Sequence, residues 1–138
     1  MRGIFKAALI AVALSAVFAA PVAAGPFEDG VAAYARGDYA PLFRLLRPFA
    51  EQGDATAQYS LGVMYANGQG VTQDYAEAAK WSRKAAAQGH AGGQSNLGFM
   101  YGEGQGVTQD DAQAVKWYRK AAAQGHADAQ HSLGVMYA

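Results

Sequence analysis

Apolar residues recur along this chain at spacings of three and four, interrupted by short stretches rich in glycine. Such spacing places apolar side chains along one face of an α-helix. We predict a helix over residues 55–66, where Leu61 and Met64 share a face. We predict a second helix after Asp74, with Trp81 pointing inward.

The residues between these helices are typical of turns and helix ends. A glycine-rich loop, residues 67–71, can reverse the chain direction because glycine adopts positive φ at little cost. Asp74 is a favoured N-cap residue, and with Glu77 three residues later it fits a capping box whose loss would cost about 1 kcal/mol. Gly89 is placed to end the second helix. The pattern therefore predicts a helix-turn-helix hairpin.

The hairpin is repeated with a period of 36 residues. Residues 54–89 align with residues 90–125 at 24 identical positions out of 36, and residues 126–138 begin a third copy. Residues 25–53 hold a diverged upstream hairpin. Repeats of this length stack on their neighbours to bury a continuous core. We therefore predict an all-α fold: an α-solenoid of antiparallel helix-turn-helix repeats.

Some residues are the same in the copies that contain them, and we predict that they pack, cap or turn the helices. Each first helix has an interior glycine, although glycine there costs about 1 kcal/mol relative to alanine. Close approach of a neighbouring helix would offset that cost. The structural positions are Leu61, Gly62, Met64, Tyr65, Gly68, Gly70, Asp74, Trp81 and Gly89, then Leu97, Gly98, Met100, Tyr101, Gly104, Gly106, Asp110, Trp117 and Gly125, then Leu133, Gly134, Met136 and Tyr137.

The repeated motif is A-x-A-Q-x-x-L-G-x-M-Y-x-x-G-x-G-V-x-x-D followed by A-x-x-W-x-x-K-A-A-x-Q-G. It resembles the Sel-one-like repeat, a relative of the tetratricopeptide repeat, and the resemblance covers residues 54–138. The upstream hairpin, with Gly37 and Tyr39, is more similar to a plain tetratricopeptide turn. The resemblance implies a tetratricopeptide-like scaffold that binds other proteins or peptides. It implies no catalytic residue.

The amino-acid composition argues against one class of partner and excludes two kinds of site. The chain has 138 residues, with 11 basic and 11 acidic residues, and no cysteine. A chain without net charge offers no basic surface for nucleic acid, so we expect no nucleic-acid partner. Without cysteine there is no disulfide and no thiolate metal site.

The first 24 residues have the pattern of a secretory signal peptide. Arg2 and Lys6 precede an apolar stretch, residues 7–20, and small residues follow it. We expect cleavage after Ala24, with Ala19 as the alternative. The apolar stretch is short for a membrane span of about 20 residues, so an uncleaved anchor is the less favoured reading. We therefore expect an exported protein, periplasmic or secreted, with no stable membrane insertion.

Residues that could suggest chemistry have simpler explanations. His90 and His126 lie at helix starts, one repeat apart, and lack the neighbouring ligands that zinc needs, so we interpret them as surface residues. The glycines of the 67–71 loop follow a helix rather than the strand of a nucleotide-binding motif. No serine lies in a hydrolase motif. We predict no catalytic residue, cofactor or metal. The alternative is an enzyme acting on β-lactams or the cell wall, as suggested for cysteine-rich relatives in the family.

Positions that differ between copies are free to serve recognition. On the first helices they fall four residues apart on one face. If the first helices line the concave side of the array, these residues form a groove for a protein or peptide partner. Neutral drift of a surface is the alternative explanation. We name this set the differing stripe: Tyr59, Val63, Ser95, Phe99, Glu103 and His131.

The third copy contains only its first helix. Its apolar residues Leu133, Met136 and Tyr137 are therefore expected to lack the partner helix that follows in the other copies. The favoured explanation is that the sequence is a fragment of a longer protein. The alternative is that another chain covers this face, so self-association is possible.

Overall fold

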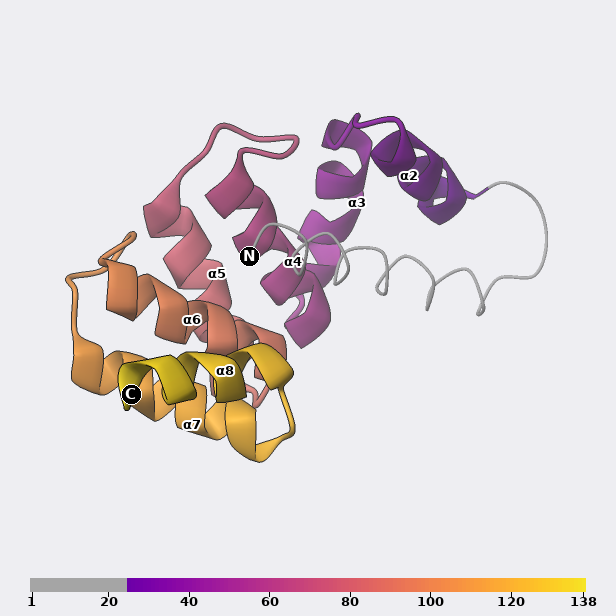
Figure 1. Ribbon diagram of the computed structural model, residues 1–138. Helices are drawn as coiled ribbons and strands as arrows, with labels where there is room; N and C mark the ends of the chain where they lie inside the picture. The colour runs from indigo at the N-terminus through magenta and orange to yellow at the C-terminus, as the bar shows by residue number, and fades with distance from the viewer. Residues whose placement is uncertain (1–24) are drawn as a thin grey trace.

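The computed structural model describes residues 25–138, and the predicted signal peptide lies outside this range. Within residues 25–138 the chain forms seven α-helices and no strand (Figure 1). Their bounds are α2 (Pro26–Ala35), α3 (Ala40–Glu51), α4 (Ala55–Asn67), α5 (Tyr75–Ala87), α6 (Ala91–Glu103), α7 (Asp111–Ala123) and α8 (Ala127–Met136).

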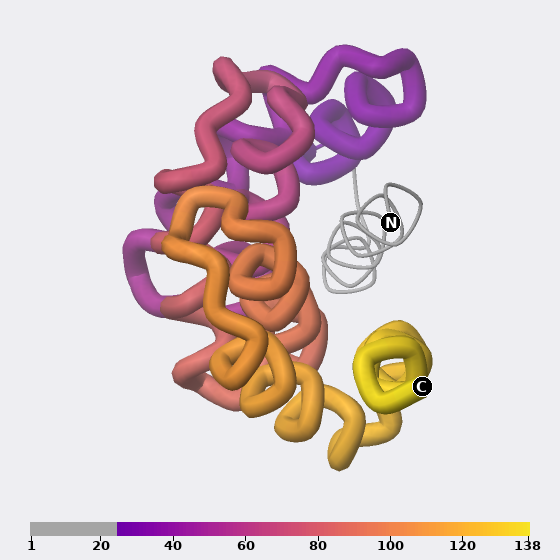
Figure 2. Tube along the Cα trace, turned by 60° about the vertical axis from the view of Figure 1, so that its left-hand side comes forward, coloured from indigo at the N-terminus to yellow at the C-terminus, as the bar shows by residue number. Residues whose placement is uncertain are grey.

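Each helix packs mainly on the helices next to it in sequence, so the hairpins α2–α3, α4–α5 and α6–α7 follow one another in a curved stack (Figure 2). α4 also contacts α6. These are the first helices of two successive hairpins. The prediction of an α-solenoid built from helix pairs is confirmed.

The core follows the predicted apolar faces. The largest hydrophobic cluster joins α3, α4 and α5, and Leu42, Leu46, Leu61 and Met64 in it are each at most 1% exposed. Smaller clusters continue along the stack, one of them around Met100. Each cluster contains residues from adjacent helices, so the core extends from one hairpin to the next.

The predicted helix ends are largely confirmed. The carboxylates of Asp74 and Asp110 each accept a hydrogen bond of 3.1 Å from the backbone N–H three residues later, as N-caps do. The reciprocal half of the capping box is not formed by Glu77 among the described residues: its side chain pairs with Lys80 instead. Gly68 ends α4 with φ of +64°, in the left-handed region that glycine favours.

The interior glycines permit close helix approach in two of the three copies. A Cβ on Gly62 would lie 2.7 Å from Ser82 Oγ, and one on Gly98 would lie 3.0 Å from the ring of Tyr118. The prediction fails for Gly134, where a Cβ would meet nothing within 4 Å. The physical reason is that no described helix follows α8 to pack against it.

The two tryptophans differ in burial. Trp81 is 6% exposed and belongs to the main core, as predicted. Trp117, its equivalent 36 residues later, is only half-buried, which corrects its assignment to the core. The ammonium groups of Lys116 and Lys120 lie 5.3 and 5.5 Å from the centre of its ring, within the range of a cation–π interaction.

Glutamine side chains tie successive hairpins together. Gln88 Nε2 donates to the backbone oxygen of Gly53, at 2.9 Å, and to Gln58 Oε1, at 2.8 Å. Gln124 makes the same two bonds, with the same lengths, to Gly89 and Gln94. These bonds satisfy the carbonyls of chain reversals and fix the register of one hairpin on the next.

Candidate binding pocket

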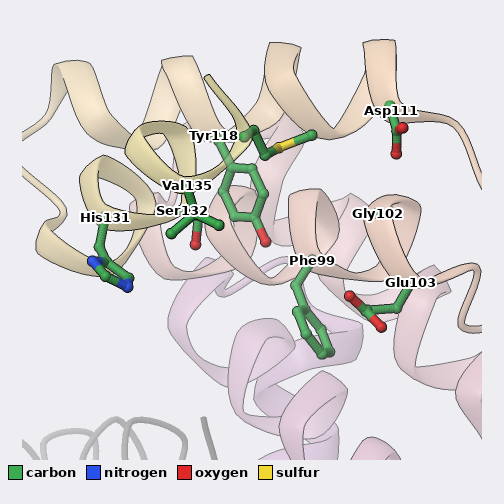
Figure 3. A pocket seen from close by; sticks show the side chains of 9 residues that line it. Phe99, Gly102, Glu103, Asp111, Tyr118, His131, Ser132 and Val135 are labelled. Atoms are coloured by element: carbon green, nitrogen blue, oxygen red, sulfur yellow. The ribbon is translucent and has the colours of Figure 1, made fainter. Parts of the chain in front are cut away.

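A pocket with a volume of about 450 Å³ lies between α6, α7 and α8 (Figure 3). α6 contributes three residues to it, α7 two and α8 four. Its lining residues are Phe99, Gly102, Glu103, Asp111, Tyr118, His131, Ser132, Val135 and Met136. A pocket of this size can hold a side chain of a partner together with its neighbouring backbone.

Tyr118 forms the middle of the pocket wall. Its ring is 6% exposed and packs with Phe99 in the core cluster of this end of the molecule. Burial raises the pKa of its hydroxyl; the hydrogen-bonded Ser132 side chain opposes that shift, and the negative charge of Glu103 adds to it. In Figure 3 the hydroxyl points between Ser132 and Phe99. The hydroxyl is thus protonated at neutral pH and available for hydrogen bonding.

The two ends of the pocket differ in chemistry. Glu103 and Asp111, both exposed, lie at one end, and His131 lies at the other (Figure 3). No lysine or arginine lines the pocket among the described residues. Between the ends, Phe99 and Val135 present apolar surface. The arrangement combines an apolar floor with a negatively charged end.

The structure brings together half of the differing stripe. Phe99, Glu103 and His131 line the pocket. Ser95 is half-buried and does not line it.

The other two stripe residues are not on an open surface, which corrects the expectation that they line a groove. Tyr59 is 3% exposed and Val63 is fully buried. The Tyr59 ring lies 4.8 Å from the His90 ring, and its tip approaches within 3.0 Å of where a Cβ on Gly92 would stand. Burial, with a smaller contribution from Asp128, raises the pKa of the Tyr59 hydroxyl. The next hairpin packs over this part of α4 and covers it.

Sequence reasoning missed pocket residues on α7, because it searched the first helices alone. Asp111 and Tyr118 come from α7 and replace Tyr75 and Ser82 of the preceding repeat. Both positions differ between copies, so a search for differing positions on both helices of each hairpin would have found them.

Of the two helix-start histidines, His90 caps its helix through its side chain, whereas His126 makes no side-chain cap hydrogen bond. His90 Nδ1 accepts a hydrogen bond of 3.1 Å from Gly93 N and so caps α6. Burial lowers the pKa of His90; the charge of His126 lowers it further, and Asp54 opposes both. Both histidines are half-buried, and the ring of His90 lies against that of Tyr59 in the preceding hairpin. Among residues 25–138 no group of three or more histidines and carboxylates is placed to hold a metal ion.

The helices described here are also too short or too polar to be membrane spans: in residues 25–138 none has the length and hydropathy that crossing a bilayer requires.

Comparison with solved structures found relatives with the same architecture. A protective antigen from uropathogenic Escherichia coli strains, displaying an SLR fold, matches 98% of this chain with 38% identity and a TM-score of 0.72, and the match covers 26% of the antigen. A Sel1 repeat protein from Oxalobacter formigenes matches 79% of this chain with 37% identity and a TM-score of 0.72, over 44% of its own length. This chain thus spans less than half of either relative.

A third match is cysteine rich protein B of Helicobacter pylori, with 33% identity, a TM-score of 0.62 and coverage of 65% of this chain and 68% of that one. A comparison with curated proteins found no match. The Sel1 repeat family model matches residues 55–90 and 91–126. These two matches take in just over half of the chain and coincide with the two complete copies of the repeat, so the chain belongs to the Sel1 repeat family.

Proposed function

We propose that this chain is an exported scaffold without catalytic activity, and that it binds a protein or peptide partner in the pocket between α6, α7 and α8. One observation carries the proposal. The two complete repeats are identical at 24 of 36 positions, yet all five pocket residues from α6 and α7 fall among the twelve positions that differ. The five are Phe99, Gly102, Glu103, Asp111 and Tyr118. Stacking of the hairpins does not dictate the residues at these positions, so they are free to serve recognition.

The chemistry of the pocket supports binding of a side chain. Phe99, Tyr118 and Val135 offer apolar and aromatic surface, and the groups at the rim are polar or charged. Apolar anchors surrounded by a polar rim are the usual anatomy of a recognition site. Proteins with Sel1 repeats are generally scaffolds for protein partners, and this supports the same choice.

The proposed pocket is tested by affinity capture. The purified chain and a Phe99→Ala, His131→Ala double variant are each used to capture proteins from the periplasmic fraction of the source cell, and captured proteins are identified by mass spectrometry. The control is Phe49→Ala, which removes a phenylalanine, 41% exposed, from α3 and outside the pocket.

A protein captured by the wild type and by the control, and lost from the double variant, is the expected result. Circular dichroism must show equal helix content in all three proteins. Equal capture by all three would contradict the pocket as the binding site.

Export is proposed from the pattern of the first 24 residues alone. Expression in a Gram-negative host, followed by mass measurement of the protein in the periplasmic fraction, tests it. We expect a chain that begins at Gly25. A full-length chain retained in the cytoplasm would contradict export.

The absence of catalysis is tested against the enzyme alternative. We expect no hydrolysis of a chromogenic β-lactam above the buffer rate. Turnover that Phe99→Ala abolishes would overturn the scaffold proposal and assign chemistry to the same pocket.

A further inference from the structure

The acidic end of the pocket arises from two departures from the repeat. Glu103 stands where the preceding repeat has Asn67, and Asp111 stands where it has Tyr75. Two neutral positions have thus become negatively charged, and both line the same end of one pocket (Figure 3). The charge is therefore specific to this junction and is not part of the shared scaffold.

Glu103 is placed where the helix itself disfavours a carboxylate. It is the last residue of α6, and the C-terminal end of a helix carries partial negative charge. No capping role explains it, because Gly104 provides the left-handed ending of α6. The helix gives no reason for a carboxylate at this position, where the other copy has asparagine. We therefore assign the charge of Glu103 to the pocket rather than to the helix.

Neither carboxylate is neutralised within the described chain. The ion pairs among residues 25–138 are Arg47 with Glu51 and Lys80 with Glu77, both far from the pocket in sequence. Both pocket carboxylates are exposed, so they remain available to a cation from outside.

From this placement we propose that the partner is an extended peptide segment with an apolar side chain and a nearby lysine or arginine. The apolar side chain packs on Phe99, Tyr118 and Val135, and the cation lies beside Glu103 and Asp111. This inference rests on the proposed function, because it names the partner class of the same pocket. An extended segment suits the site because neighbouring side chains on one side of it are about 7 Å apart, which separates the two groups along the pocket.

The test uses short peptides of glycine and serine with one central leucine. A lysine, glutamine or glutamate is placed one, two or three residues to either side, so that members of a set differ only in charge. Each peptide is titrated into the isotope-labelled full chain, and the dissociation constant is measured from NMR shifts.

Two variants of the chain test whether the acidic end of the pocket causes a preference for the lysine peptide. Glu103→Asn with Asp111→Asn removes the acidic end, and asparagine at the first position is the residue that the preceding repeat already carries. The matched control is Glu77→Gln, which removes a carboxylate outside the pocket and introduces the residue that stands at Gln113.

We expect the best lysine peptide to bind about tenfold more tightly than its glutamate counterpart, since each exposed charge pair contributes a few-fold in affinity. The preference should disappear in the double variant, persist in the control and shrink at about 0.5 M salt, where exposed charges are screened.

Equal affinity of the three peptides for the wild type, with binding lost in Phe99→Ala, would overturn this inference and leave the proposed function standing. A lysine preference that survives in the double variant would also overturn it. Failure of every peptide to bind, while pocket-dependent capture of a protein is retained, would overturn this inference alone, and failure of both experiments would overturn the proposed function as well.

Discussion

Where α6 packs on α4 and α5, the helices meet closely, and we call this the closed junction. Where α8 packs on α6 and α7, the same repeat leaves a pocket, and we call this the open junction. At the closed junction the small Ser82 accepts a buried hydrogen bond of 2.7 Å from Asn96 Nδ2. At the open junction the equivalent residues are Tyr118 and Ser132, which line the pocket wall. Val135, which is 63% exposed, stands in α8 at the position that Phe99 occupies in α6.

The difference shows how one repeat forms two kinds of junction. The leucine, glycine, methionine and glutamine positions stay the same and hold the hairpins in register. A few exchanges at positions outside that set change the volume and charge of the junction without changing how the helices are capped or turned. Met100 and Met136 occupy equivalent positions in α6 and α8, as do Gly98 and Gly134, and each pair tests this difference.

The largest contrast is expected between Met100 and Met136. Met100 is 1% exposed and Met136 is 37% exposed. Replacement of Met100 by alanine should lower the free energy of unfolding by about 3 kcal/mol, because it leaves a cavity in the core. The same change at Met136 should cost less, about 1 kcal/mol, because its side chain is already partly exposed and it is the last residue of α8. Urea unfolding followed by circular dichroism measures both values, and equal losses would refute the contrast between the junctions.

A smaller contrast is expected between the interior glycines. Gly98→Val should lower the free energy of unfolding by about 2 kcal/mol, because the new side chain meets Tyr118 and the backbone oxygen of Ala114, which lie 3.0 and 3.2 Å from its Cβ. Gly134→Val should be neutral or stabilising, because its Cβ meets nothing within 4 Å and valine has the higher helix propensity. Thermal unfolding of the two variants beside the wild type checks the prediction. Destabilisation by Gly134→Val as large as that by Gly98→Val would contradict it.

The smallest effect concerns pH and the histidine that begins α6, the helix shared by both junctions. The pKa of His90 is lowered from 6.5, chiefly by burial, so the folded state favours the neutral ring. The unfolded state then binds more protons, so the stability contributed by His90 is complete above pH 6.5 and is lost as pH falls from there through the lower pKa of the folded state.

We therefore expect acidification from about pH 7.5 to about pH 5.5 to lower the melting temperature of the wild type more than that of His90→Asn, because asparagine also caps helices but does not titrate. The carboxylates are common to both proteins and serve as the internal control. An identical loss in the two proteins would show that His90 does not contribute.

Much of the fold could be predicted because its signals are local. The N-cap at Asp74, the left-handed glycine at Gly68 and the apolar face around Leu61 depend on residues within a turn or two of one another. The close approach at Gly62 and Gly98 could be inferred as well, because a glycine that costs helix stability needs a compensating contact.

The candidate site was only partly predictable. Positions that differ between copies identified Phe99, Glu103 and His131, but the same criterion also selected Tyr59 and Val63, which the structure buries. A difference between copies does not reveal whether a side chain faces solvent or the next hairpin. That depends on how residues 36 apart in sequence are stacked.

The sequence by itself determined the period of the repeat, the ends of its helices and the residues that its core requires, because each follows from the spacing of neighbouring side chains. The tertiary structure alone decided which differing positions remain open. Curvature of the stack covers Tyr59 with the start of α6 and joins α7 to α6 and α8 around one pocket. The physical reason is that exposure is set by the packing of one hairpin on the next, and that packing has no counterpart in the local pattern of the chain.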